Sequence, residues 1–325
     1  MIFINNNSIT TPAVNLAIEE YAVRNFDLNE DYVFLYSNEN SVICGKNQNV
    51  FEEIDYKFCI ENNIGAFRRI SGGGAVFHDT GNLNFSFLTK YENKKFNKYA
   101  DFVKPVIDCL KKNNIDVYLN SRNDIFSGEK KISGNAQFVT RDRMLCHGTL
   151  LVNSNLVLLR KTLNSDASKY FSKSTKSVKS SVVNISEEIK GIDVLEVKNM
   201  IREEIILTSA YFGEYFFSTE EWQDIYELAK KKYNSFEWNY GRSPDFIFEN
   251  KKLIGDKSFV VKLEIFEGII KNAQIFKNGK RDSVTEEILI NKKYDLQYLT
   301  SMPILKMFPA EFPEGLKKDF IKILF

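Results

Sequence analysis

Residues 68–82 carry the densest chemical signal in the chain and read Arg-Arg-Ile-Ser-Gly-Gly-Gly-Ala-Val-Phe-His-Asp-Thr-Gly-Asn. The segment 66–70 is a predicted strand, and the glycine triplet at 72–74 follows it. Consecutive glycines let the backbone approach a ligand closely with its amides turned toward an anion. The two arginines before the triplet supply charge for a phosphate or carboxylate. The pattern is neither a Walker A loop nor G-x-G-x-x-G, and a triplet alone is more often a tight turn.

Further along the chain, two segments add polar groups to predicted strands. Lys131 starts an apolar run beside the small-residue step Ser133-Gly134, so it can project an ammonium into a pocket for a carboxylate and a phosphate. Taken alone, a solvated lysine is the simpler interpretation. In the segment 147–153, a glycine interrupts a strand, as happens where a ligand or another backbone comes close.

The hydrophobic pattern of the whole chain is α+β. Helical spacing follows Thr11-Pro12 and recurs in later segments, at 53–62, 97–113, 194–211 and 219–233. Strand-like runs occupy 32–36, 41–44, 83–88, 131–140, 144–152, 245–248, 258–265 and 268–276. The runs at 131–140 and 144–152 indicate a hairpin across 141–143, and a tight turn at 266–268 separates the last two runs. A Ser- and Lys-rich stretch at 163–181 predicts a mobile basic loop. Glycine and proline near 237–244 indicate a connection between a large domain, 1–241, and a small one, 245–325.

Composition excludes several classes of function. The 44 basic and 43 acidic residues nearly cancel, so no global charge favours nucleic acid or a membrane surface. No apolar run reaches the roughly 20 residues of a membrane span, and the N-terminus lacks the pattern of a secretory signal. The four cysteines are widely spaced and the two histidines far apart, which argues against a zinc site. We expect a cytoplasmic monomer with reduced thiols and with neither a nucleic-acid nor a membrane partner.

Together, in this order and spacing, the three segments resemble the lipoate–protein ligase family (lipoate-protein ligase A type), part of the biotin/lipoate ligase superfamily. The likeness continues in residues 176–184, which look like the adenylate-covering loop of that family, and in 238–244, which look like its domain junction. It covers nearly the whole chain. The resemblance implies an α+β fold, with a large mixed-sheet biotin/lipoate ligase-like catalytic domain and a smaller α+β C-terminal domain.

The resemblance also implies an activity. Ligases of this family react lipoate with ATP to give lipoyl-AMP and pyrophosphate, and then transfer the lipoyl group to a specific lysine of a carrier. The expected partners are the lipoyl domains of dehydrogenase E2 subunits, the glycine-cleavage H protein, or both. Mg²⁺ is implied by the ATP chemistry, with its ligands unassigned. The preferred carrier, the acceptance of octanoate and the need for the small domain stay open.

Site residues carry over from the matching motif positions. Lys131 matches the catalytic lysine that contacts both the lipoate carboxylate and the α-phosphate. The residues expected to bind ATP or lipoyl-AMP are Arg69, Gly74, Ala75, Val76, Phe77, Asn82 and Lys131. Those expected to bind lipoate are Ser71, Gly73, Gly74, Lys131 and Thr149. We interpret four neighbours as non-catalytic, His78 and His147 as structural residues, and Arg141 and Arg143 as solvated turn residues. Asp79 is expected to orient the loop.

An ATP-independent octanoyl- or lipoyl-transferase is the alternative enzyme. Such a transferase forms a thioester on an activated cysteine, and the candidates are Cys44, Cys59, Cys109 and Cys146. Cys59 and Cys109 lie in apolar patterns typical of a core, and strand alternation points Cys146 away from the face of His147. A biotin ligase has a different glycine-arginine signature. A catalytically silent binding module has no support either, because none of the motif segments is missing.

Overall fold

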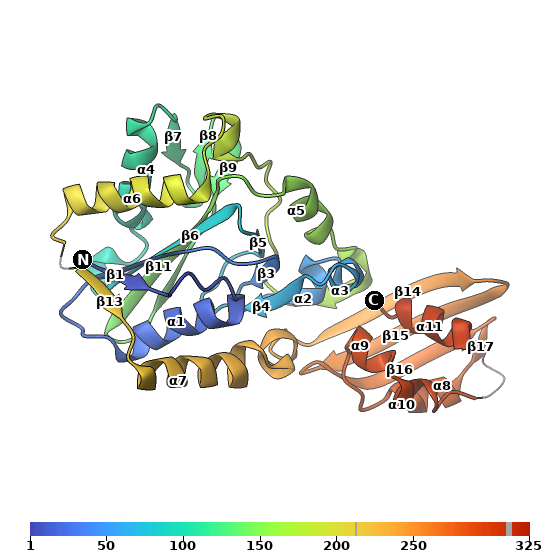
Figure 1. Cartoon of the computed structure of the whole chain (residues 1–325). Helices are drawn as coiled ribbons and strands as arrows, with labels where there is room; N and C mark the ends of the chain where they lie inside the picture. The colour runs from blue at the N-terminus through green and yellow to red at the C-terminus, as the bar shows by residue number, and fades with distance from the viewer. Residues whose placement is uncertain (212, 310–313) are drawn as a thin grey trace. The chain divides into compact units, whose positions relative to one another are not determined.

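The computed structural model describes residues 1–211, 213–309 and 314–325 (Figure 1). Two compact units are present, and neither is one continuous piece of sequence. The first comprises 1–46, 67–160 and 177–234, and the second comprises 47–66, 161–176 and 235–325. The domain division at 241–245 that we inferred from the sequence stays a prediction. In the described residues, no helix is both long and apolar enough to cross a membrane.

A six-stranded mixed sheet organises the first unit (Figure 1). In spatial order its strands are β10 (Asn135–Val139), β11 (Arg143–Leu151), β6 (Asn82–Lys90), β2 (Tyr32–Tyr36), β1 (Ile2–Asn5) and β13 (Gly213–Phe216). β1 runs parallel to both of its neighbours, and the other pairs are antiparallel. The β10–β11 pair is the hairpin expected across 141–143. The mixed sheet with its helices confirms the predicted fold class.

Helices cover both faces of this sheet (Figure 1). α1 (Pro12–Asn25) and α7 (Thr219–Leu228) lie on one side, and α4 (Tyr99–Lys112) and α6 (Val194–Thr208) on the other. Proline occupies the first turn of α1, where its missing N–H costs nothing, although the Thr11 side chain makes no capping bond. Both α6 and α7 begin with a complete capping box, which satisfies exposed backbone donors at each start.

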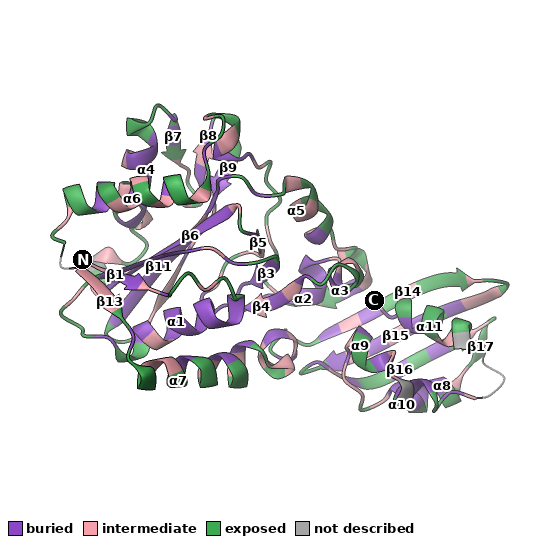
Figure 2. Ribbon diagram, viewed as in Figure 1, coloured by how far each residue is buried: buried purple, intermediate pink, exposed green. Residues whose placement is uncertain are grey.

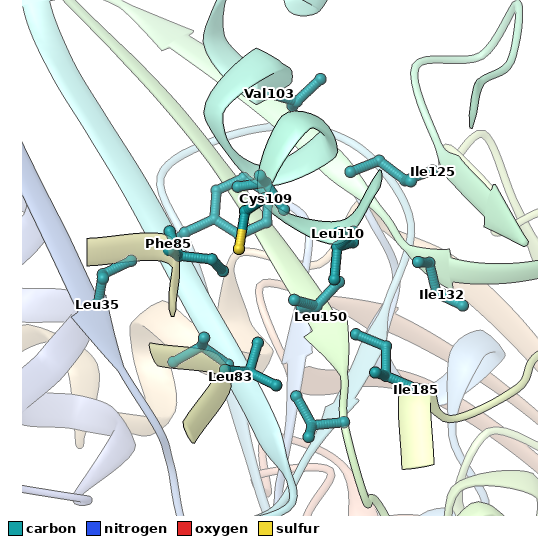
Figure 3. Close-up of a cluster of buried hydrophobic side chains, with 14 of the residues drawn as sticks. Leu35, Leu83, Phe85, Val103, Cys109, Leu110, Ile125, Ile132, Leu150 and Ile185 are labelled. Atoms are coloured by element: carbon teal, nitrogen blue, oxygen red, sulfur yellow. The ribbon is translucent and has the colours of Figure 1, made fainter. Parts of the chain in front are cut away.

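The hydrophobic core of the first unit lies between the sheet and α4 with α6. Alternate residues of β6, Leu83, Phe85 and Phe87, face this side and pack with α4 residues such as Val103 and Leu110. Figure 3 shows this cluster, with Leu150 of β11 and Ile132 among the side chains that converge on it. In Figure 2 the strands of the sheet are largely buried, while exposed residues follow the outer sides of α6 and α7. The opposite set of sheet residues is therefore available for other roles.

Two small sheets extend the first unit. One contains β7 (Val117–Leu119), β8 (Ile125–Ser127) and β9 (Lys130–Ser133), and the other β4 (Gly65–Arg68), β3 (Ser41–Cys44) and β5 (Val76–His78). The run predicted as one strand at 131–140 is divided at Gly134 into β9 and β10, which belong to different sheets. The same small-residue step that marked the sequence thus redirects the chain.

The second unit is built on an antiparallel five-stranded sheet. In spatial order its strands are β12 (Tyr170–Ser172), β14 (Phe246–Ile254), β15 (Lys257–Phe266), β16 (Ile269–Lys277) and β17 (Lys280–Arg281). Its helices are α2 (Val50–Glu53), α3 (Tyr56–Glu61), α8 (Ser283–Leu289), α9 (Leu296–Leu299), α10 (Met302–Leu305) and α11 (Glu314–Lys322). The predicted tight turn between β15 and β16 is confirmed, with positive φ at Glu267 and Gly268.

Short elements complete the chain. A helix, α5 (Leu156–Thr162), follows β11, and irregular helical turns occupy 93–95, 167–169, 185–187, 229–233 and 237–241. β12 lies inside the stretch that the sequence predicted as a mobile loop. It pairs there with β14, from Tyr170 opposite Phe248 to Ser172 opposite Phe246. Part of this stretch is therefore a strand at the edge of the second sheet.

Candidate active site

The glycine triplet forms a loop between β4 and β5, held against the end of β3. A Cβ atom at Gly45 would lie 2.1 Å from the carbonyl oxygen of Gly73, so the two backbones come into direct contact. Gly73 has φ +91°, in the region that glycine tolerates best. Next to it, Gly72 has nothing within 4 Å of its hypothetical Cβ. The loop is thus tightly supported on one side and open on the other.

Arg69 is the internal support of this loop. Its guanidinium donates hydrogen bonds to Ser71 Oγ (2.9 Å) and to the carbonyl oxygens of Ile43 (2.9 Å), Gly72 (2.6 Å) and Gly74 (2.8 Å). Burial lowers the pKa of Arg69 to about 10, so the group keeps its charge at neutral pH. Arg68 is also buried and donates to the carbonyls of Gly45 and Lys46. Both arginines therefore shape the loop, and the nucleotide contact expected of Arg69 stays a prediction.

A buried polar network joins the loop to the sheet. Ser71 Oγ lies 2.7 Å from Nε2 of His147, and Nδ1 of the same ring lies 3.0 Å from Oε2 of Glu19. The Glu19 carboxylate also accepts hydrogen bonds from the hydroxyls of Tyr36 and Ser86. Burial by itself would raise the pKa of Glu19, but His147 and these hydroxyls lower it below its ordinary value. The network fits the structural role predicted for His147.

This network lies on the face of the sheet opposite the hydrophobic core. On β11, Cys146 and Leu150 belong to that core, so His147 and Thr149 point to the other face, toward α1. The Thr149 amide donates to the carbonyl of Gly134 at 3.1 Å, next to β9. A Cβ at Gly148 would lie 2.5 Å from the Phe85 ring, which explains why a glycine interrupts this strand. The alternation of side chains along β11 therefore places its polar site residues on one face of the sheet and its core residues on the other.

Lys131 is fixed at both its backbone and its side chain. Its amide donates to the carbonyl of Ser181 at 2.9 Å, and its carbonyl accepts from the amide of Val183 at 3.1 Å. Its ammonium lies 2.9 Å from Oδ1 of Asp124, and its side chain is 23% exposed. A Cβ at Gly134 would be only 3.0 Å from Nζ, so the glycine leaves room for the lysine to lie where it does. The ammonium is therefore held by an ion pair, and the side chain is partly buried but still accessible.

Residues 177–183 connect the glycine loop to Lys131. Ser177 Oγ accepts a hydrogen bond from the Ala75 amide at 2.8 Å, while Ser181 and Val183 flank the Lys131 backbone. A Cβ at Gly74 would lie 2.9 Å from Ser177 Oγ, so the segment also needs the last glycine of the triplet. These contacts bring together two motifs that are far apart in sequence, through the segment expected to cover the adenylate.

Other predicted site residues follow the loop into β5 and β6. Val76 is partly exposed, whereas the Phe77 side chain is buried. Asn82 is fully buried at the start of β6 and donates to Asn84 Oδ1 at 3.0 Å. These positions place Val76 next to the open loop and Asn82 within the protein interior. The ligand contacts expected of all three stay predictions.

The neighbouring charged residues have structural contacts. His78 is buried with Nδ1 2.9 Å from Asn38 Nδ2, and burial together with the nearby Arg69 charge lowers its pKa to about 3. The Asp79 carboxylate accepts hydrogen bonds from the amides of Gly81 and Asn155 and so holds the turn before β6, while its expected role in orienting the glycine loop stays a prediction. One interpretation was wrong. Arg143 is not a solvated turn residue but is buried, because its guanidinium donates to the carbonyls of Glu30 and Asp27.

None of the four cysteines has the surroundings of a catalytic thiolate that is open to solvent. Cys44, Cys59, Cys109 and Cys146 are all buried, and none of them forms a disulfide. Burial raises the pKa of Cys109 to about 11 and that of Cys146 to about 12. A nucleophilic cysteine requires the opposite shift. The described residues also contain no group of three or more His, Cys, Asp or Glu side chains that could hold a metal ion.

Several site residues were not identified from the sequence. Glu19 gave a signal that we did not use, since an acidic residue in the middle of an apolar helix is buried only when it has partners. Asp124 and Gly45 gave no comparable local signal, because each acquires its role from a contact with a distant segment.

The fold and the site together define a class of protein. It is an α+β protein with an open glycine loop and a separately held lysine, an arrangement suited to a carboxylate beside a phosphate. The family model for the lipoyl protein ligase A/B catalytic domain matches residues 11–206. Lipoate-protein ligase LplJ of Bacillus subtilis is 38% identical over 331 residues, covering 100% of both chains. The chain belongs to the lipoyl protein ligase family.

Solved structures of lipoate ligases share this fold. A lipoate-protein ligase A bound with ATP is 26% identical with a TM-score of 0.63, covering 74% of this chain and 98% of its own. The bi-partite lipoate protein ligase of Thermoplasma acidophilum, studied with its E2 lipoyl domain, is 25% identical with a TM-score of 0.64. That match covers 78% of this chain and 98% of the archaeal one.

Proposed function

We propose that this chain is an ATP-dependent lipoate–protein ligase, which converts lipoate and ATP to lipoyl-AMP and transfers the lipoyl group to a lysine of a carrier protein. The observation that carries the proposal is the ion-paired ammonium of Lys131, whose strand is connected through residues 177–183 to the glycine loop. Membership of the ligase family gives this arrangement its substrates, and the relatives bound to ATP or studied with an E2 lipoyl domain support them.

In the first step, a lipoate carboxylate oxygen attacks the α-phosphorus of ATP and pyrophosphate leaves. Two anions must approach each other, and Lys131 offsets their repulsion with a fixed positive charge. In a partly buried site such a charge acts through a lower effective dielectric than in water, and it needs no reorganisation during the reaction. Lys131 is therefore the catalytic residue of the proposal and contacts both lipoate and the α-phosphate.

In the second step, the amine of a carrier lysine attacks the acyl carbon and AMP leaves. The amide bond forms as the mixed-anhydride bond breaks, and the amine loses a proton to solvent. We assign the binding of ATP and lipoyl-AMP to Arg69, Gly74, Ala75, Val76, Phe77, Asn82 and Lys131. For lipoate the assigned residues are Ser71, Gly73, Gly74, Lys131 and Thr149. In this assignment Arg69 acts mainly through the loop shape that its hydrogen bonds maintain.

Mg²⁺ enters the proposal as part of the MgATP substrate. The described residues hold no ready cluster of metal ligands, and Mg²⁺ in nucleotide sites is commonly held by substrate phosphates with one or two carboxylates. Its protein ligands are left unassigned. As carriers we propose lipoyl domains of dehydrogenase E2 subunits, the glycine-cleavage H protein, or both.

Lipoate-dependent release of pyrophosphate from ATP tests the proposal. The purified full-length chain should release pyrophosphate only when lipoate is present. Lys131→Ala should lower the rate about 100-fold or more, the range seen when a fixed electrostatic contact is removed. Lys130→Ala is the matched control, because Lys130 is the exposed neighbour on the same strand, and it should keep wild-type activity. Lipoyl transfer without ATP would instead support a cysteine-based transferase.

A further inference from the structure

We propose that Asp124 is a positioning residue for the adenylation step, which holds the Lys131 ammonium so that two of its N–H groups face the two reacting anions. This inference deepens the proposed function and rests on it. Its basis is the ion pair between Lys131 Nζ and Asp124 Oδ1 at 2.9 Å, with the two side chains 23% and 15% exposed. A contact this short between partly buried groups constrains the lysine far more than a surface pair does.

The ion pair with Asp124 uses one of a fixed number of hydrogen-bond donors on the Lys131 ammonium. Lys131 has three N–H groups and no acceptor. With one of them directed at Asp124, two remain. The proposed reaction needs one contact to the lipoate carboxylate and one to the α-phosphate, which is two contacts in total. Without Asp124, the flexible four-carbon side chain of Lys131 has no fixed direction for its charge.

Asp124 is itself held by a tight turn. The Asn120 side-chain oxygen accepts hydrogen bonds from the amides of Arg122 and Asp124, each at 2.9 Å. The backbone of Asn120 also donates to the Asp124 carbonyl at 2.9 Å. Asn123, just before Asp124, has φ +66°. Its carbonyl oxygen accepts a hydrogen bond from Asn135 Nδ2 at 2.7 Å. The carboxylate therefore stands on a rigid base that is tied to β10 and is not a surface side chain that happens to reach the lysine.

Because Asp124 is negatively charged, its removal should affect kcat and KM differently. A carboxylate beside Lys131 weakens the attraction of the ammonium for other anions, so it does not help substrates to bind. If its role is to direct the ammonium, removing it leaves the KM values for ATP and lipoate unchanged or lowers them, while kcat falls. A general structural defect raises KM or reduces the amount of active enzyme. The two roles are therefore separable by kinetics.

The experiment measures kcat and KM for lipoate-dependent pyrophosphate release with the full-length chain. Asp124→Ala should lower kcat about tenfold or more, since small misplacements of a catalytic group cost this much, with no rise in either KM. Asp124→Asn keeps an oxygen acceptor in nearly the same shape and should restore most of kcat. Asp116→Ala, an exposed acidic residue just before β7, should match the wild type.

Each contrary result is distinct. An unchanged kcat in Asp124→Ala overturns the positioning role. So does recovery of that variant by raised Mg²⁺ concentration, which would make the carboxylate a ligand of the ion. A rise in KM without loss of kcat also overturns it. If the wild type itself releases no pyrophosphate with lipoate, the proposed function fails instead, whatever the variants do.

Discussion

The amide of Ala75 donates a hydrogen bond to Ser177 Oγ across 2.8 Å, although the two residues are 102 positions apart in the chain. The bond closes residues 177–183 over the end of the glycine loop. It also satisfies a backbone donor that would otherwise be one of the amides available to an anion. If a phosphate binds at the Ala75 amide, as we propose, then its binding and closure by Ser177 depend on the same N–H group.

Ser177→Ala should loosen this closure. The variant removes the acceptor for the Ala75 amide and forfeits a hydrogen bond with a net value of about 1 kcal/mol. Trypsin should then cut more quickly after Lys176 or Lys179, both of which are exposed. Ser180→Ala removes an exposed hydroxyl from the same segment and should leave the cleavage rate unchanged. Equal rates in all three proteins would show that the bond does not hold the segment.

Gly45→Ala should disrupt the glycine loop. The added methyl group would meet the Gly73 carbonyl oxygen at 2.1 Å, and both partners are backbone, so neither can rotate away. We expect a loss of about 1–3 kcal/mol in the free energy of unfolding, as for other overpacked sites. Urea unfolding measures it. Gly72→Ala is the control for stability, because its Cβ would meet nothing within 4 Å. Equal loss in both variants would contradict the steric explanation.

His78 should make the protein less stable in mild acid. Its pKa is lowered to about 3 in the folded chain, against about 6.5 when unfolded. Between these values the unfolded state binds more protons, so stability falls as the pH drops below 6.5. The His78 contribution reaches about 2 kcal/mol at pH 5. Urea unfolding from pH 5 to 7.5 should show a steeper fall in the wild type than in His78→Gln, and parallel curves would refute the assignment.

Thiol chemistry should have no part in the reaction. Native protein should resist alkylation by iodoacetamide at all four cysteines, which are buried, and urea should expose them. Cys146→Ala should retain adenylation and transfer, with some loss of stability from the cavity that it leaves. A stable lipoyl thioester on any of the four, detected by mass spectrometry of the native enzyme, would contradict the ligase mechanism.

Local patterns in the sequence were sufficient to predict the α+β class, the hairpin at β10–β11 and a glycine turn that follows a strand. Each depends on residues close together in the chain. The contacts that shape the site could not be predicted in this way. Glu19 faces His147 only because α1 packs on one face of the sheet, and Asp124 reaches Lys131 only across a turn. Arg143 was predicted to be solvated because its partners are the backbone carbonyls of Glu30 and Asp27. Backbone groups from a distant segment give no pattern in the sequence around Arg143.

The second compact unit is assembled from three separate stretches of sequence, and this has a consequence for how the protein is made. The ring centroids of Phe51 and Tyr294 lie 4.8 Å apart. The Tyr56 hydroxyl donates a hydrogen bond to the Asp295 carboxylate, and β12 pairs with β14. A ribosome delivers Phe51 and β12 long before their partners have emerged. These segments therefore stay without their partners in the nascent chain until late in translation. During that time they are exposed to chaperones and to aggregation. A chain truncated after residue 241 would lack the partners of these segments altogether.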